Sequence, residues 1–305
     1  MSLDRWAGAD FAAFVLLASL LLGCSTPNVS PSSTPSPAAF RGAVNLGSPV
    51  NSQDFDGGPS ISSDGLSLYF VTDRDISSGG DIWVAVRRST SEPFGPPKNL
   101  GPPVNSSDDE GAPSISADGL ELFFDRAPEG RIYVATRPSI TAAFGRPQIV
   151  DLGRTGCCDG FPYVSADGHE LYFCSDRPGG LGGDDVWVTS RPSAGSTFGA
   201  PVNLGPTVNS ASNDCEPSTS SDGKTLFFAS DRKGGSGGYD IWLSIRGSRS
   251  QPLGQPVNAG HQINSGFSDE RPDIAADGAT LYFMSDRRDG LGSFDLWQAS
   301  RGSPA

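Results

Sequence analysis

The sequence has no surplus of positive charge. It holds 22 Lys and Arg against 35 Asp and Glu, which gives a formal net charge of -13 at pH 7. Binding to nucleic acid or to anionic lipid headgroups depends on basic residues that pair with phosphates. The composition therefore argues against both partners, whereas a cationic partner or metal cations would fit the charge. The alternative is an acidic surface that only keeps the protein soluble.

Histidine is scarce, and this limits the chemistry that the chain can carry. The two histidines are His169 and His261, and neither lies near the cysteines at a ligand spacing. A zinc site needs clustered Cys and His, and a hydrolytic triad needs a His beside its nucleophile. We therefore expect no metal site, no cofactor and no Ser-His-Asp catalysis.

The N-terminal apolar run is too short to cross a bilayer as a helix. It spans Phe11 to Gly23, FAAFVLLASLLLG, which is the length of a signal-peptide core. The run ends in LLGCS, which resembles the lipobox of bacterial lipoproteins, although Leu22 stands where a small residue is more usual. The resemblance implies that Cys24 is lipidated and becomes the mature N-terminus. An ordinary secretory signal is the alternative.

The segment after this cysteine is rich in Pro, Ser and Thr. Residues 25–39 read STPNVSPSSTPSPAA, a composition that cannot bury a core and that predicts an extended tether. Ser25 directly after Cys24 resembles lipoproteins sorted to the outer membrane. We therefore expect a signal peptide over 1–24, a tether over 25–39 and a folded domain over 40–305, anchored at the cell envelope by lipid alone.

The folded domain is built from a repeat. Asp-Gly turns recur at Asp64, Asp118, Asp167, Asp222 and Asp277, with spacings of 54, 49, 55 and 55 residues. Each turn is preceded by a short segment such as PSTS and followed by an apolar strand such as KTLFFAS. An Asp-Arg pair, a glycine-rich loop and a third strand such as DIWLSIR complete the unit. Asp-Gly between such runs is a strong hairpin signal, so each unit predicts three antiparallel strands.

A fourth segment lies between the units and reads, for example, FGAPVNLG from Phe198. No such segment follows the fifth unit, but a matching FRGAVNLG begins at Phe40. A strand from the N-terminus thus completes the last unit, which removes the open edges of a linear array. We predict an all-β fold, a five-bladed β-propeller of four-stranded antiparallel blades. A linear β-solenoid is the less favoured alternative, since its coils are shorter.

The repeat resembles a known family. The pattern P-x-x-S-x-D-G-x-x-L-Y-F-x-S-D-R, followed by G-G-x-D-I-W, is similar to the WD-like propeller repeat of TolB-type periplasmic proteins, over residues 40 to 301. The resemblance implies a propeller, but that family includes partner-binding proteins as well as propellers attached to hydrolases. The second unit departs most, because Arg131 and Tyr133 replace Asp and Trp and its glycine loop is shortened. We expect a tighter corner there.

Acidic residues precede the first strand of every unit. In a propeller the first strand is innermost, so these residues should surround one mouth of the central channel. Clustered carboxylates there would focus a negative field and attract a cationic group, a basic peptide or a metal ion. The alternative is that each acid caps its own turn. The predicted binding ring consists of Asp56, Asp109, Glu110, Asp159, Asp214, Glu216, Asp269 and Glu270.

Cysteines and one glycine loop suggest two further sites. An exported protein can form disulfides, and Cys158 with Cys215 is the predicted pair, with Cys157 as the alternative partner of Cys215. The loop Gly179–Asp184 matches the calcium repeat G-G-x-G-x-D. That motif acts through closely stacked tandem copies, which are lacking here, so calcium is the weaker alternative to no cofactor.

These observations favour a non-catalytic binding module over an enzyme. A glycosidase needs carboxylates in different environments, and on the predicted innermost strands only Asp273 breaks the repeat as a unique acid. We therefore expect a monomeric envelope lipoprotein that binds an envelope protein or a cationic peptide segment. A carbohydrate-binding or glycan-hydrolysing propeller is the alternative.

Overall fold

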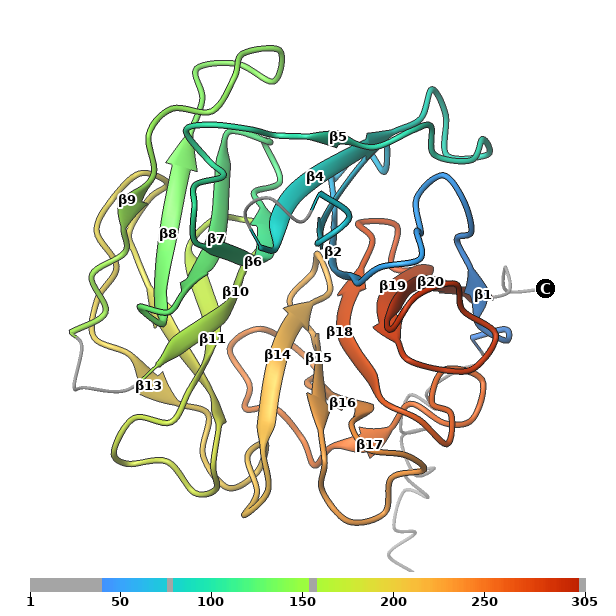
Figure 1. Ribbon diagram of the computed structural model, residues 1–305. Coiled ribbons are helices and arrows are strands. Elements are labelled where there is room, and N and C mark those ends of the chain that lie inside the picture. The colour runs from blue at the N-terminus through green and yellow to red at the C-terminus, as the bar shows by residue number, and fades with distance from the viewer. Residues whose placement is uncertain (1–39, 76–78, 154–157, 302–305) are drawn as a thin grey trace, which may run out of the picture. The chain divides into compact units, whose positions relative to one another are not determined.

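The computed structural model describes residues 40–75, 79–153 and 158–301. Within these residues, twenty strands form five four-stranded antiparallel sheets that are arranged as a five-bladed β-propeller (Figure 1). The predicted fold class is confirmed. None of the residues described forms a helix long and apolar enough to span a membrane. The predicted signal peptide, the lipidated Cys24 and the tether lie outside the described residues.

Each blade is a meander in which the first strand lies at one edge of the sheet and the fourth at the other. Blade 1 contains β2 (Asp56–Ile61), β3 (Ser67–Thr72), β4 (Asp81–Val86) and β5 (Lys98–Asn99); blade 2 contains β6 (Asp109–Ile115), β7 (Glu121–Ala127), β8 (Arg131–Thr136) and β9 (Gln148–Ile149). Blade 3 contains β10 (Asp159–Val164), β11 (Glu170–Ser175), β12 (Asp185–Ser190) and β13 (Val202–Asn203). Blade 4 contains β14 (Asp214–Thr219), β15 (Thr225–Ser230), β16 (Asp240–Ile245) and β17 (Val257–Asn258). Blade 5 contains β18 (Asp269–Ile274), β19 (Thr280–Ser285), β20 (Asp295–Ser300) and β1 (Val44–Asn45).

The N-terminal strand closes blade 5, as the repeat predicted. β1 pairs antiparallel with β20, with Val44 opposite Gln298, and an isolated bridge joins Phe40 to Arg301. The two strands lie side by side in Figure 1, where the blue start of the described chain meets its red end. The Arg301 guanidinium stacks over the Phe40 ring at 4.7 Å. Both ends of the described chain therefore stabilise the same blade.

The repeated aromatic residues pack inside the sheets. Trp187, Trp242 and Trp297 are at most 9% exposed, and Tyr133 takes the same position in blade 2. In each blade the arginine of the Asp-Arg pair stacks over this ring, at distances between 4.6 and 5.4 Å. The covered rings are therefore part of the core and not a ligand platform.

Blade 2 has the tight corner that was expected. β7 ends at Ala127 and β8 begins at Arg131, whereas eight residues separate β3 from β4. The Gly130 N–H donates to the Arg126 carbonyl at 3.0 Å, and Gly130 has φ = 57°. A left-handed residue is needed to turn the chain within so few residues, and glycine allows it without strain.

Candidate functional site

Five acids of the predicted ring are buried in ion pairs. Each carboxylate pairs with the arginine that closes the second strand of its own blade, and no acid side chain is more than 8% exposed. The pairs are Asp56–Arg74, Glu110–Arg126, Asp159–Arg177, Asp214–Arg232 and Asp269–Arg287. Four of the acids also accept the N–H of a serine in the turn before the strand. A ring of free carboxylates is therefore wrong for these five residues, and the capping alternative describes them.

The remaining three predicted ring acids do not form a ring either. Asp109 is exposed and accepts the Gly80 N–H at 3.0 Å. Glu216 is buried and pairs with Arg271, whose Nε lies 3.3 Å from Glu216 Oε1. Glu270 is half-buried; its burial and then the neighbouring Glu216 raise its pKa to about 8. Glu216 and Glu270 are close enough for their charges to interact, but they form a pair and not a ring.

The side chains around the axis come from one position in each first strand. A β-bulge interrupts each of these strands directly before its proline, and the residue at the bulge has a positive φ in every blade. A bulge redirects side chains locally, and these residues line one shared cavity. They are Gly58, Ala112, Phe161, Glu216 and Arg271. The sequence contains a sign of this site, because the residue before this proline differs in every repeat while the surrounding positions are similar.

Arg271 fills this end of the channel. Its guanidinium stacks over the Phe161 ring of blade 3 at 4.5 Å and pairs with Glu216 of blade 4. It also lies against Gly58 of blade 1, where a Cβ would come within 2.7 Å of Nη1. The cavity left beside these residues measures about 30 Å³, which is room for a water molecule and not for a sugar ring.

Two further carboxylates near the axis break the repeat symmetry. Asp273 is 6% exposed, accepts the Ile61 N–H at 2.6 Å, and has a pKa that burial raises to about 7. Asp125 accepts the Phe161 N–H at 2.7 Å, and burial raises its pKa although Arg271 opposes this. Acids with raised pKa values can donate protons. The channel cavity beside Asp273 is too small for a sugar ring, and Asp125 instead borders a separate cavity of about 260 Å³.

Asp125 does not occupy the position that the aspartates of the other Asp-Arg pairs occupy. The sequence pairs Asp125-Arg126 with the other Asp-Arg pairs, but Asp125 lies opposite Gly111, where Val71 lies opposite Gly57 in blade 1. The Asp-Arg pair of blade 2 therefore lies two residues closer to the start of its second strand than in blade 1. Because of this shift, the Asp125 side chain contacts Phe161 of blade 3 and lies near the channel, where the other blades have no acid at this position.

The disulfide joins Cys174 and Cys215, whose Cα atoms are 5.1 Å apart, and Cys158 keeps a free, exposed thiol. The predicted pair Cys158–Cys215 is wrong, although the link does join adjacent blades as expected. The reason is the packing of each second strand on the next blade. At the position of Cys174, blade 5 has Met284, which lies directly over Gly57 of blade 1, and Gly57 corresponds to Cys215. Cys157, the alternative partner, lies outside the described residues.

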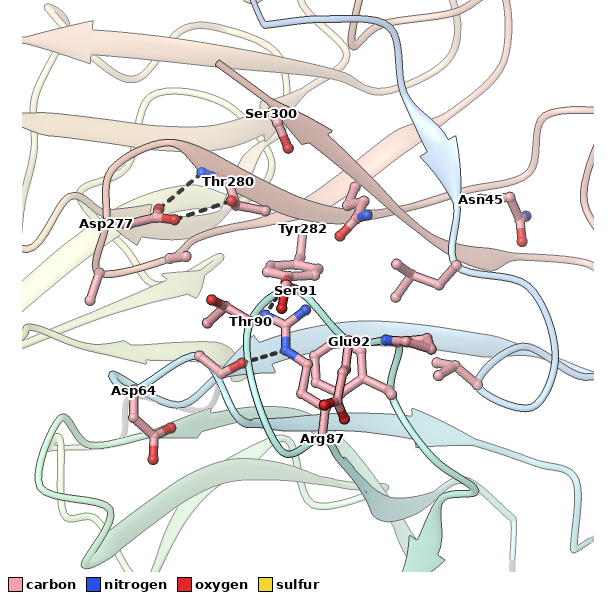
Figure 2. Close-up of a pocket in the computed structure, with 18 of the residues that line it drawn as sticks. Asn45, Asp64, Arg87, Thr90, Ser91, Glu92, Asp277, Thr280, Tyr282 and Ser300 are labelled. Atoms are coloured by element: carbon pink, nitrogen blue, oxygen red, sulfur yellow. Dashed lines mark hydrogen bonds between the residues drawn. The ribbon is translucent and has the colours of Figure 1, made fainter. Parts of the chain in front are cut away.

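A much larger cavity lies elsewhere, between blades 5 and 1. It measures about 650 Å³, a size typical of ligand sites, and opens beside the Asp-Gly turns (Figure 2). We call it the 5–1 groove. Its lining includes Asn45, Asp64, Arg87, Thr90, Ser91, Glu92, Asp277, Thr280, Tyr282 and Ser300. No prediction from the sequence pointed to it.

The 5–1 groove carries a net negative charge. Asp64, Glu92 and Asp277 are exposed, and within the described residues no hydrogen bond or ion pair reaches the Glu92 carboxylate. The single arginine in the lining, Arg87, is held in place: it donates to the Gly65 carbonyl at 2.8 Å and to the Tyr282 hydroxyl at 3.2 Å (Figure 2). Three carboxylates therefore face one immobilised cation.

A corresponding place between blades 3 and 4 is occupied by the protein itself. Arg249 of blade 4 forms an ion pair with Asp167 in the Asp-Gly turn of blade 3, and its Nη2 lies 3.8 Å from Glu170 Oε2. The hydrogen bond to Asp167 raises the pKa of Arg249. In blade 1 the residue at the position of Arg249 is Thr90, and Asp277 takes the place of Asp167. The 5–1 groove therefore has the equivalent aspartate, Asp277, but no arginine at the position of Arg249.

Comparison with known proteins finds relatives in structure and none in sequence. The chain matches neither a protein-family model nor a curated protein sequence. The likeness is one of fold. The chain is similar to TolB from Acinetobacter baumannii, with a TM-score of 0.50 and 15% identity, over 82% of this chain and 55% of that chain. It thus spans about half the length of that TolB.

Glycoside hydrolases share the fold as well. The catalytic domain of the Coprinopsis cinerea GH62 α-L-arabinofuranosidase has a TM-score of 0.55 and 12% identity, over 87% of this chain and 98% of that chain. A thermostable family-43 glycoside hydrolase has a TM-score of 0.54 and 15% identity, over 85% and 97%. Because these identities are low, the comparisons support the propeller and leave its activity open.

Proposed function

We propose that the protein is a non-catalytic binding platform that receives a cationic segment of a partner protein in the 5–1 groove. The main support is the ion pair between Arg249 and Asp167, because a guanidinium occupies the place between blades 3 and 4 that corresponds to the 5–1 groove. A guanidinium donated by a partner could meet Asp277 as Arg249 meets Asp167. Planar guanidinium groups match carboxylates well in geometry and charge, which favours arginine over lysine in the partner.

The proposed setting is the cell envelope, with a lipid anchor at Cys24. This rests on the lipobox resemblance and on a fold shared with TolB. Phe40, where the predicted tether meets the propeller, bridges to Arg301, whose N–H donates to Ala279 beside the Asp-Gly turn of blade 5. The 5–1 groove lies beside the same turn. It would then open on the side of the propeller where Phe40 bridges to Arg301.

A glycan-hydrolysing propeller is the second candidate. The fold shared with GH62 and family-43 hydrolases favours it. So do three acids near the axis that have no counterpart in the other blades, Asp125, Glu216 and Asp273. The geometry supports it less, because Asp125 and Asp273 accept backbone N–H groups and Arg271 blocks the channel beside them. A binding role uses the open groove and needs no rearrangement.

The test is the binding of an arginine-rich peptide to a groove with its charge removed. The variant Asp64→Asn, Glu92→Gln, Asp277→Asn keeps the side-chain shapes and removes three negative charges. We expect it to bind a fluorescent Gly-Arg repeat peptide at least about tenfold more weakly than the wild type, by anisotropy at low salt. The same peptide with citrulline in place of arginine should bind neither protein, because its side chain is neutral.

A matched control removes three exposed acids from the opposite face. Asp54, Asp109 and Asp176 are exposed and lie on the side of the glycine-rich loops, so Asp54→Asn, Asp109→Asn, Asp176→Asn changes the net charge equally. We expect this variant to bind the peptide as the wild type does. If it loses binding while the groove variant keeps it, the 5–1 groove is not the site.

A further inference from the structure

Two sulfur atoms and one carboxylate meet between blades 3 and 4. Sγ of Cys174, Sγ of Cys215 and a carboxylate oxygen of Asp184 all lie within 4.8 Å of one another. Both cysteines are buried, and Asp184 is half-buried. The two cysteines are joined as a disulfide, so they are not metal ligands in this state.

The backbone of Asp184 holds the residue in place through two hydrogen bonds. Its N–H donates to Asn213 Oδ1 at 3.1 Å, and its carbonyl accepts the Asp214 N–H at 2.7 Å. Within the described residues, no hydrogen bond or ion pair reaches its carboxylate. Asp184 and Cys174 line a cavity of about 260 Å³, and the exposed Cys158 belongs to the same lining. An ion could reach the Asp184 carboxylate through this cavity.

We infer that reduction of the Cys174–Cys215 disulfide creates a site for a soft divalent cation, held by the two thiolates and Asp184. A dithiol reductant breaks the S–S bond, gives one proton to each sulfur and is itself oxidised to a disulfide. The cation then displaces both thiol protons into solvent and binds two thiolates and one carboxylate, which leaves the site with a net charge of -1. A water molecule from the cavity can complete a four-coordinate shell.

The chemistry of the ligand set favours zinc or cadmium over calcium. In a tetrahedral zinc site, sulfur lies about 2.3 Å and a carboxylate oxygen about 2.1 Å from the metal, so the ligands lie roughly 3.5 Å apart. Atoms within 4.8 Å of one another need only small movements once the S–S bond opens. Calcium prefers six or more oxygen ligands, which two sulfurs cannot supply. The loop Gly179–Asp184, which resembled a calcium motif, thus contributes its aspartate to a softer site.

The experiment uses the full chain with Cys24→Ser, Cys157→Ser and Cys158→Ser, so that every remaining thiol belongs to the site. The protein is reduced with a phosphine, desalted without oxygen and titrated with Cd²⁺. We expect one Cd²⁺ per chain, a thiolate-to-cadmium charge-transfer band in the ultraviolet, and release of about two protons at pH 7. The unreduced protein should show neither the band nor the proton release.

Asp184→Asn tests the third ligand. This variant keeps both cysteines and should bind Cd²⁺ at least about tenfold more weakly, with its secondary structure intact by circular dichroism. Asp176→Asn is the matched control, since it removes an exposed acid nearby, and it should bind as the parent does. Equal binding by Asp184→Asn, no charge-transfer band after reduction, or the same band without reduction would each overturn the inference.

Discussion

Asp214→Ala is expected to lower the free energy of unfolding by about 3–5 kcal/mol, because it leaves a charge without its partner inside the protein. Asp214 is fully buried and pairs with Arg232. It also accepts the Ser210 N–H, the Ser210 hydroxyl and the Ser230 hydroxyl, so the substitution removes the acceptor of four hydrogen bonds at once. Chemical denaturation in urea measures the loss. The reason for the size of the effect is the burial of the pair, since exposed pairs contribute far less.

Asp109→Ala is the matched comparison at the same mouth of the propeller. Asp109 was predicted to share the binding ring with Asp214, but it is exposed and its side chain accepts only the Gly80 N–H among the described residues. We expect its loss to change the free energy of unfolding by less than about 1 kcal/mol. Similar small effects for both variants would contradict the scaffold role of the buried acids.

The stability of the protein is expected to fall as the pH rises from 5 to 8. Burial raises the pKa of Asp273 to about 7, whereas an unfolded Asp titrates near about 3.9. Between these values the folded protein holds a proton that the unfolded chain has lost. The stabilisation is therefore complete below about pH 4 and is lost as the pH rises through 7. The raised pKa of Glu270 acts in the same direction.

Asp273→Asn should remove this part of the pH dependence. The amide stays neutral and its oxygen can still accept the Ile61 N–H that Asp273 accepts. We expect the wild type to lose about 2 kcal/mol between pH 5 and 8 through this group and the variant to lose correspondingly less, by urea denaturation at each pH. An unchanged slope in the variant would show that Asp273 is already ionised in the folded protein.

The fold could be predicted from the sequence because each repeat unit contains the signals for its own strands and turns. Asp-Gly marks each hairpin, an apolar strand follows each of these turns, and the FRGAVNLG segment at Phe40 indicates the closure of blade 5. Each of these signals is local and repeats five times. The five blades could therefore be predicted without knowledge of how they contact one another.

The sites depended on contacts between residues that are distant in sequence, some within one blade and some between blades, which the local repeat pattern does not reveal. The acids before the first strands looked like a ring because their arginine partners stand some 16 to 18 residues away in sequence. The partner of Cys215 depended on which strand packs on the next blade. The 5–1 groove depends on Thr90 standing where blade 4 has Arg249, a difference that has meaning only beside Asp277.

The most direct test of the binding role is to give the 5–1 groove the arginine that it lacks. In Thr90→Arg the new side chain stands where Arg249 stands in blade 4 and can pair with Asp277 as Arg249 pairs with Asp167. Ala194→Arg adds the same charge at the corresponding, exposed position of blade 3, away from the groove. In calorimetric titration with the Gly-Arg peptide, we expect Thr90→Arg to bind at least about tenfold more weakly and Ala194→Arg to bind as the wild type. Undiminished binding by Thr90→Arg would contradict the proposal.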